Sequence, residues 1–473
     1  MIRARFAPSP TGYLHIGSAR TFIFNWLYVR RNSGSMVLRI DDTDLDRNTE
    51  ASLNSIYEGL NWLDLSWDEF YRQSDRLDLH RKLAYELLAK GLAYRDFTPA
   101  ADLEQEDIHA EGPWLCHPAM RALSAEESQS RADAGEPFVI RFRVERNPAR
   151  EVTFVDQVYG PQSKSTADME DFALLRSTGM PTYHLASCAD DIDLQITHVI
   201  RGQDHLSNTF KHILLFKAAA GSVPHFAHLP LLIAPDGAKL SKRKHGPVVS
   251  VMTYRDAGFL PLGYINFLCL LGWSPKDNRE QMSLEELVSA FSFEGVNRSN
   301  AVVNFSESDP IDAKALWLNS QHLRTMPVGA LAPLVRRVLS DHKLTPFGDE
   351  SFFEHVVDTI RSRYATLLDF PIKGRAYFAD DFPIEHQAME KLNASGAREL
   401  VRELGKRLAT QSEFSETSVE TALRKLAEER GVKAGLLINA SRAALTGQSV
   451  GPSAFAVFAC IGRERAIERL SRV

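Results

Sequence analysis

Strand-like and helix-like segments alternate at the start of the chain, and this alternation limits the possible folds more than any other feature of the sequence. Strand patterns cover residues 2–7 and 36–40, and each is followed by a helical stripe of apolar residues, at 18–31 and 52–63. A turn-rich run at 8–12 ends the first strand. Strands and helices at this spacing predict an α/β fold with a parallel sheet and crossover helices.

The stretch at 94–187 interrupts this rhythm. It contains alternating strand patterns at 139–144 and 151–155 in a more mixed context. Strand-like segments of the first type then resume at 197–201 and 228–233. We therefore expect 94–187 to be a domain inserted between two halves of one sheet.

From about residue 310 the pattern changes to helices without interleaved strands. Leu331, Val335 and Leu339, for example, fall on one helical face. We expect an all-α C-terminal half made of two subdomains. The expected divisions are 1–93, 94–187, 188–309 and 310–473.

Composition excludes several classes of protein. The net charge is −6, with 44% hydrophobic and 25% charged residues, which excludes a disordered chain and a generally basic nucleic-acid binder. Basic residues outnumber acidic ones from residue 401 onward, which is compatible with a local nucleic-acid surface. The beginning of the chain has no apolar signal segment, and the most apolar stretch, 264–273, is too short to cross a bilayer. We expect a cytoplasmic protein that does not contact membranes.

Residues 7–18 join the first strand directly to the first helix. The N-terminus of a helix offers free backbone N–H groups and a positive dipole end, both of which attract phosphate. His15 could hydrogen-bond a developing oxyanion, and Gly17 would let a flat base approach the backbone. A tight turn in which His15 only caps the helix explains the same residues.

A cation-rich run follows the strand pattern at 228–233. Residues 239–244 contain Lys239, Lys242, Arg243 and Lys244. Cations on a mobile loop can close over a triphosphate and stabilise the charge on the departing pyrophosphate. A solvated surface loop is the alternative interpretation of this run.

Together the two segments resemble the HIGH and KMSKS signatures of class I aminoacyl-tRNA synthetases, here residues 15–18 (HIGS) and 239–243 (KLSKR). Other segments resemble the bacterial glutamyl-tRNA synthetases within that class, in family order: 5–12, 39–44, 182–185, 198–205, 254–261, 271–274 and 442–447. The resemblance extends from Arg3 to about Leu470, which is essentially the whole chain.

This resemblance implies a Rossmann-type catalytic body, split by a domain that holds the tRNA acceptor end, and a helical half that binds the anticodon arm. It also implies a two-step reaction that uses ATP and Mg²⁺. L-Glutamate attacks the ATP α-phosphate to give glutamyl-adenylate, and a terminal ribose hydroxyl of tRNA(Glu) then takes the glutamyl group. Members of the family are generally monomers.

The resemblance also assigns roles to individual residues. The implied catalytic residues are His15, Lys239 and Lys242. The implied ATP-binding residues are His15, Gly17, Ser18, Asp204, His205, Leu240, Ser241 and Lys242. The implied glutamate-binding residues are Arg5, Ala7, Ser9, Asp41, Tyr183, Ser187 and Arg201. A guanidinium can hold a carboxylate with two hydrogen bonds, so Arg5 and Arg201 suit discrimination of glutamate from glutamine. In the helical half, Arg363 is the candidate tRNA contact.

Three positions depart from the family pattern. Asp41 occupies a position that more often carries glutamate, which pairs with the substrate ammonium, so its reach is shorter by one methylene. Ser187 replaces a polar amide residue, and Gln203 replaces glutamate. We expect these changes to alter the amino-acid pocket and to leave the ATP site intact.

The cysteines indicate neither a disulfide framework nor a zinc site. Cys116, Cys188, Cys269 and Cys460 lie far apart in the sequence, and no Cys-x-x-Cys pair is present. Some relatives carry a zinc site in the inserted domain, but here Cys116 and His117 stand alone. Two adjacent ligands cannot complete a tetrahedral site, so we predict no structural zinc.

Two other functions remain as alternatives. The first is a paralogue that attaches glutamate to tRNA(Gln), because the pocket residues permit it. The second is a non-catalytic tRNA-binding paralogue, although such a protein would be expected to lose His15 or the loop at 239–243, and both are intact. A tRNA-modifying relative without the helical half and a glutaminyl enzyme with a β-barrel anticodon part both conflict with the helical pattern after residue 310.

Overall fold

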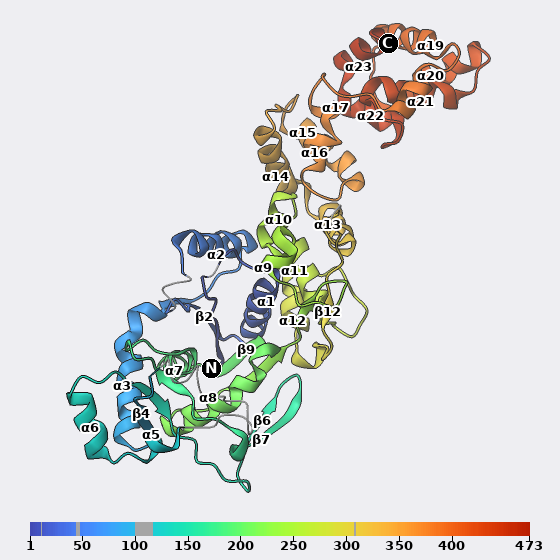
Figure 1. Ribbon diagram of the computed structural model, residues 1–473. Helices are drawn as coiled ribbons and strands as arrows, with labels where there is room; N and C mark the ends of the chain where they lie inside the picture. Colours follow the sequence, from blue (N-terminus) through green and yellow to red (C-terminus); the bar gives the residue numbers. More distant parts are fainter. Residues whose placement is uncertain (11, 44–47, 100–116, 307–308) are drawn as a thin grey trace. The chain divides into compact units, whose positions relative to one another are not determined.

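The computed structural model describes residues 1–10, 12–43, 48–99, 117–306 and 309–473. The chain forms two compact units, which Figure 1 colours along the sequence. The first unit comprises Met1–Thr253 and Ile265–Asp312, and the second comprises Tyr254–Tyr264 and Ala313–Val473. Among the described helices, none combines the length and the apolar character that a membrane span requires.

A seven-stranded sheet forms the centre of the first unit, in the order β3-β2-β1-β9-β10-β6-β7. Its strands are β1 (Arg3–Phe6), β2 (Ser35–Ile40), β3 (Glu69–Arg72), β6 (Glu151–Asp156), β7 (Gly160–Ser165), β9 (His198–Gly202) and β10 (His225–Leu229). Neighbouring strands from β3 through β6 run parallel, and β7 pairs with β6 in an antiparallel hairpin. The expected parallel sheet is therefore present.

Helices cross between the parallel strands as the apolar stripes predicted. Helix α1 (Ile16–Arg31) connects β1 to β2 and buries Phe22 and Leu27. It begins before residue 18, the expected start, because His15 is its N-cap and accepts a hydrogen bond from the Gly17 N–H at 3.0 Å. The other helices of this unit are α2 (Glu50–Leu63), α3 (Leu77–Ala89), α5 (Pro118–Ala122), α6 (Ala125–Asp133), α7 (Tyr183–Asp193), α8 (Leu206–Ala218), α9 (Lys242–His245) and α12 (Leu284–Ala290).

The strand that was expected at 228–233 lies elsewhere. Strand β10 covers His225–Leu229, and a separate short strand, β11 (Leu232–Ile233), pairs with β12 (Ala301–Val302). Pro230 separates the two strands, and proline has no N–H with which to continue a ladder. The apolar run therefore contributes to two sheets.

Part of the expected insertion forms its own sheet. Strands β4 (Ala93–Asp96), β5 (Val139–Phe142) and β8 (Ala173–Leu175) form a three-stranded antiparallel sheet. The hairpin of β6 and β7, which lies between β5 and β8 in the sequence, instead extends the seven-stranded sheet through β10. The strand expected at 151–155 therefore joins the central sheet, and the boundaries of the insertion at 94 and 187 stay predictions.

The second unit is helical throughout its described residues. Its helices are α13 (Ala313–Thr325), α14 (Val328–Asp341), α15 (Glu350–Ile360), α16 (Asp369–Ile372), α17 (Arg375–Phe378), α18 (His386–Leu392), α19 (Ala397–Thr410), α20 (Glu416–Glu429), α21 (Ala434–Thr446), α22 (Ala454–Ile461) and α23 (Arg463–Ser471). Helices α10 (Val251–Asp256) and α11 (Pro261–Leu270) precede them in the chain. One hydrophobic core, which includes Leu331, Val357 and Leu404, extends through the unit. The predicted all-α C-terminal half is confirmed.

Candidate active site

A cavity of about 560 Å³ opens in the first unit, where the parallel strands β1, β2, β9 and β10 end. The carboxyl ends of parallel strands meet at one edge of a sheet, and ligands of such sheets bind there. Predicted site residues that line the cavity are Arg5, Ala7, Ser9, His15, Gly17, Ser18, Asp41, Tyr183, Ser187, Arg201, Asp204, His205, Lys239, Leu240 and Ser241. Arg363 belongs to the other unit, and the side chain of Lys242 lies outside the described part of the chain.

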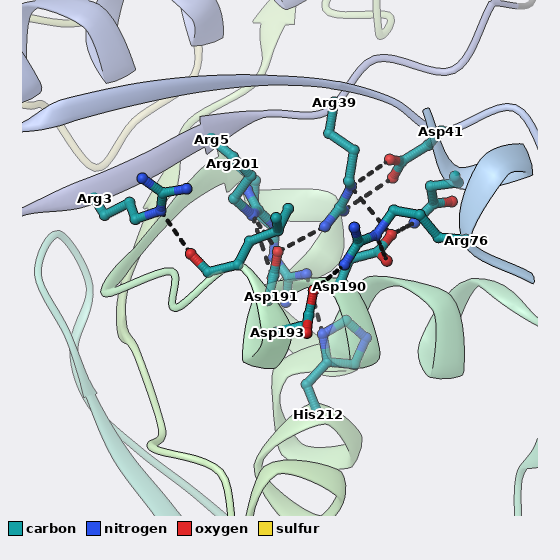
Figure 2. Close-up of polar contacts among 12 residues, drawn as sticks. Arg3, Arg5, Arg39, Asp41, Arg76, Asp190, Asp191, Asp193, Arg201 and His212 are labelled. Atoms are coloured by element: carbon teal, nitrogen blue, oxygen red, sulfur yellow. Dashed lines mark hydrogen bonds and ion pairs between the residues drawn. The ribbon is translucent and has the colours of Figure 1, made fainter. Parts of the chain in front are cut away.

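Two arginines on neighbouring strands, both of which line the cavity, share the carboxylate of Asp191 (Figure 2). Arg5 Nε donates to Asp191 Oδ1 and Oδ2 at 3.0 and 3.2 Å, and Arg39 Nη1 donates to Asp191 Oδ1 at 2.7 Å. Arg39 Nε also donates to Asp41 Oδ1 at 2.7 Å. Burial raises the pKa of Asp41, and the positive charge of Arg39 opposes that rise. Asp191 and Arg39 thus link Arg5, which is predicted to bind the substrate carboxylate, to Asp41, which is predicted to bind the substrate ammonium.

A second carboxylate of α7, that of Asp190, supports the same network. It accepts hydrogen bonds from Gln73 Nε2 at 2.9 Å, Arg76 Nε at 2.8 Å and His80 Nε2 at 2.8 Å. Burial alone would raise the pKa of Asp190, but the hydrogen bond from His80 and the charge of Arg39 outweigh burial and lower it. Asp190 is therefore an ionised group in the interior.

No sequence motif assigned a role to these supporting residues. Arg39 lay in a recognised motif without a role, and Asp190 and Asp191 received none. Their signal is an adjacent acidic pair inside helix α7, between Ala189 and Ile192. Acidic residues are rarely buried unless they are paired, so such a pair in a half-apolar helix indicates cationic partners.

Arg201 differs from Arg5 because its hydrogen-bond partners are uncharged. It is 6% exposed and donates to Tyr183 Oη at 3.0 Å, Thr209 Oγ1 at 2.8 Å, the His205 carbonyl at 3.2 Å and His228 Nε2 at 3.2 Å. Within the described residues, no carboxylate forms an ion pair with it. Burial lowers the pKa of Arg201. A buried cation without a carboxylate partner favours an anionic ligand.

A second group of lining residues suits phosphate. His15 caps α1 at the cavity wall, and a Cβ atom at Gly17 would lie 3.3 Å from His15 Nδ1, so glycine leaves room for this cap. Lys239 Nζ donates to Asp204 Oδ2 at 2.8 Å. The N-terminus of a helix and a nearby cation together can stabilise negative charge on a phosphate group.

The loop that carries these cations is attached to the turn before α1. Tyr13 Oη donates to the Gly246 carbonyl at 2.7 Å, and His15 forms an isolated bridge with Ser250. His205 also lines the cavity, with its Nδ1 3.2 Å from Tyr183 Oη, and burial lowers the pKa of His205 to about 4. Its imidazole is therefore neutral near pH 7.

The three departures from the family pattern occupy different environments. Asp41 lines the cavity and accepts a hydrogen bond from Arg39, and Ser187 lines it as a buried residue of α7. Gln203 is not among the lining residues; its Nε2 donates to Asn300 Oδ1 at 2.9 Å. Only Asp41 and Ser187 are thus positioned to change the pocket directly.

Metal-binding groups are sparse in what the structure describes. Across those residues, no three or more His, Cys, Asp or Glu side chains form a set that could hold a metal ion. Cys188, Cys269 and Cys460 are free and buried, whereas Cys116 lies outside the described residues. The absence of structural zinc stays a prediction.

In the second unit, Arg363 is exposed at the end of a short 3₁₀ turn, Arg361–Arg363. The described carboxylates form no ion pair with its guanidinium. Burial lowers the pKa of Arg442, and the charge of Arg363 contributes to that shift. Two cations are therefore close together on this unit.

Comparison with known proteins agrees with both units. Residues 1–308 match the family described as tRNA synthetases class I (E and Q), catalytic domain, and residues 330–473 match an anticodon binding domain. A glutamate–tRNA ligase of Solibacter usitatus is 53% identical over 100% of this chain and 99% of its own length. One from Thermus thermophilus is 39% identical over 100% and 99% of the two chains.

A solved structure extends this likeness to three dimensions. The glutamate tRNA ligase from Elizabethkingia meningosepticum, in complex with its amino acid, superposes with a TM-score of 0.87 at 30% identity, covering 100% of this chain and 98% of that one. The catalytic-domain match, the anticodon-domain match and the end-to-end relatives agree with the cavity and the helical unit described above. The chain therefore belongs to the class I tRNA synthetases of the E and Q family.

Proposed function

We propose that this enzyme attaches L-glutamate to tRNA and that both substrates of the first step, glutamate and ATP, bind in the cavity of the first unit. The observation that carries the proposal is that one cavity is lined by an arginine without a carboxylate partner among the described residues, by the N-terminus of α1 and by Lys239. The names of the matched relatives support glutamate as the amino acid and do not favour a misacylating or non-catalytic paralogue.

The amino-acid side of the cavity is complementary to glutamate. The side-chain carboxylate of glutamate supplies the counter-charge that Arg201 lacks, and Arg5 is a second guanidinium that lines the same cavity. Glutamine carries no such charge and would leave the buried cation of Arg201 unneutralised. Asp41, oriented by Arg39, binds the substrate ammonium. Ala7, Ser9, Tyr183 and Ser187 complete this part of the wall.

The phosphate side activates the amino acid. An oxygen of the glutamate α-carboxylate bonds to the α-phosphorus of ATP, the bond from that phosphorus to the bridging oxygen breaks, and pyrophosphate leaves. His15, Lys239 and Lys242 stabilise the charge that develops on the phosphates. Gly17, Ser18, Asp204, His205, Leu240 and Ser241 contact the nucleotide. In the second step a terminal ribose hydroxyl of tRNA attacks the glutamyl carbonyl, and AMP leaves.

Mg²⁺ enters this proposal only as a companion of ATP. Protein sites of this ion commonly use one or two carboxylates together with substrate phosphates, and Asp204 is a cavity-lining carboxylate that pairs with the cationic loop. Mg²⁺ would neutralise phosphate charge when bound. The proposed acceptor is tRNA(Glu), held in part by Arg363, and we expect a monomeric enzyme of the cytoplasm.

Charging of tRNA with labelled glutamate tests the proposal. Purified tRNA(Glu) and tRNA(Gln) are compared in parallel, and we expect the folded enzyme to charge tRNA(Glu). Charging of both, or of tRNA(Gln) alone, would assign the misacylating activity instead. Charging of neither, with ATP bound, would contradict the proposed function.

A matched pair of variants tests the amino-acid site. Arg3 and Arg5 lie on strand β1, and only Arg5 lines the cavity, whereas Arg3 pairs with Glu69. Arg5→Gln should raise the KM for glutamate by about 100-fold, because a charge-assisted contact to the substrate is lost. Arg3→Gln should leave that KM within about twofold. Equal effects of the two substitutions would remove Arg5 from the proposed site.

A further inference from the structure

Arg201 depends on a histidine for one of its hydrogen bonds. Its Nε donates to His228 Nε2 at 3.2 Å, and both side chains are buried. A guanidinium has donors and no acceptor, so Nε2 of His228 must be unprotonated for this bond to form. Strands β9 and β10 pair His228 directly with Arg201 in register, which fixes the approach of the two side chains.

The other nitrogen of the same ring contacts a carboxylate. His228 Nδ1 lies 2.6 Å from Asp156 Oδ2, and an ionised carboxylate can only accept, so the ring proton resides on Nδ1. Burial lowers the pKa of His228, which keeps the ring neutral. Asp156 thereby determines which nitrogen of His228 is available to Arg201.

The carboxylate of Asp156 is itself held in place. Its Oδ1 accepts from the backbone N–H groups of Val158 at 3.0 Å and Tyr159 at 2.9 Å, in the turn of the β6–β7 hairpin. Strand β6 pairs with β10, so Arg201, His228 and Asp156 come from three adjacent strands. The hairpin therefore contributes a residue that acts on the cavity through β10.

We propose that Asp156 is a positioning residue for glutamate recognition: it holds the Nδ1–H tautomer of His228, whose Nε2 orients Arg201 without neutralising the guanidinium. The inference rests on the proposed function of Arg201. A carboxylate in direct contact with Arg201 would compete with the carboxylate of the substrate. A neutral imidazole supplies the same orientation and leaves the charge to the ligand.

The substitution Asp156→Asn tests this device with little change of shape. The amide oxygen can still accept from Val158 and Tyr159. The amide N–H₂ now donates to His228 Nδ1, which must be unprotonated, so the neutral ring carries its proton on Nε2. Two donors then face each other at Arg201. We expect the KM for glutamate in tRNA charging to rise by about 10- to 100-fold, with the KM for ATP changed by less than about threefold.

A double-variant comparison separates this role from a structural one. In His228→Gln the amide can turn its oxygen toward Arg201 whatever residue occupies position 156, so no tautomer is involved. Asp156→Asn should therefore raise the glutamate KM by less than about threefold when it is added to His228→Gln. An equal rise in both backgrounds would overturn the proposal.

Asp171→Asn provides the matched control. Asp171 is also buried, binds Arg121 and Arg146, and does not line the cavity. Its substitution should reduce stability and leave the glutamate KM within about twofold. A rise equal to that of Asp156→Asn would make the effect a general one of buried carboxylates and overturn the proposal.

The test also covers a variant that does not fold and a wild-type enzyme that is inactive. If Asp156→Asn does not fold, His228→Gln and His228→Phe are compared, since only glutamine keeps an acceptor for Arg201; the same glutamate KM in both would overturn the proposal. A wild-type enzyme that charges no tRNA with glutamate would instead refute the proposed function. Normal charging with an unchanged KM in Asp156→Asn would refute only the present inference.

Discussion

Lys239 Nζ donates to Asp204 Oδ2 over 2.8 Å and so joins the cation-rich loop to the segment that follows strand β9. Both side chains are about half exposed, at 57% and 41%. The hydrogen bond from Lys239 helps to lower the pKa of Asp204 against the opposing effect of burial. An ion pair at this exposure contributes little to stability, so its place at the cavity mouth matters mainly for the phosphates.

Lys239→Ala should slow glutamate-dependent ATP–pyrophosphate exchange by about 100-fold, because a cation that stabilises the departing phosphates is lost. The free energy of unfolding should change by less than about 1 kcal/mol. Lys244→Ala is the control, since Lys244 forms a similarly exposed ion pair with Asp236 at 2.6 Å and does not line the cavity. Equal losses of exchange in the two variants would contradict a specific role for Lys239.

Asp191→Asn should destabilise the first unit. Asp191 accepts from both Arg5 and Arg39 in the interior, and removing its charge leaves two buried guanidinium groups short of a counter-ion. We expect the free energy of unfolding, measured with urea, to fall by about 3 kcal/mol. The glutamate KM should rise as well, because Arg5 loses the partner that orients it.

Asp193, on the same helix α7, provides the control for this prediction. Asp193 pairs with Arg76, but its side chain is 50% exposed. Asp193→Asn should reduce the free energy of unfolding by less than about 1 kcal/mol. A loss as large as that of Asp191→Asn would show that the position on α7, and not the buried charge, determines the effect.

Local patterns predicted the elements of this fold well. The apolar stripe at 18–31 indicated α1, and only its start was displaced, because the histidine cap of His15 lies outside an apolar pattern. The strand pattern at 151–155 was also correct as a strand. Alternation shows that a strand has one buried face, but it does not identify the neighbouring strand, so the pattern could not show that this strand pairs with β10.

Local sequence patterns did not predict the carboxylates that support the candidate site. Motifs named Arg5 and Arg201, because those residues are expected to touch the substrate. The carboxylates behind them, Asp191 and Asp156, approach across 186 and 72 positions of sequence, to Arg5 and to His228 respectively. Only the packing of strands and helices brings these pairs together, so residue spacing within one segment could not predict these contacts.

The stability of the second unit should depend on pH through His322. Burial lowers the pKa of His322 to about 4, whereas the unfolded chain has a pKa of about 6.5. Between these values the unfolded chain binds more protons, so stability is full above about pH 6.5 and falls as the pH decreases toward about 4.

His322→Gln should remove this contribution. Between about pH 7.5 and about pH 5, urea unfolding of the wild type should lose about 2 kcal/mol more than that of the variant. His386→Gln is the control, because the His386 side chain is 90% exposed. A pH dependence that is the same in all three proteins would contradict the assignment to His322.

Arg363→Ala should weaken binding of tRNA in particular. Arg363 is exposed, has no ion-pair partner among the described carboxylates and lies near a second cation, Arg442, as expected for a surface that meets phosphates. We expect the KM for tRNA to rise by about tenfold and the slope of log KM against log salt to decrease by about one. Arg336→Ala is the control, since that guanidinium is already paired with Glu350. Equal salt slopes in wild type and Arg363→Ala would exclude a phosphate contact, and a changed glutamate KM would indicate an effect that reaches beyond tRNA.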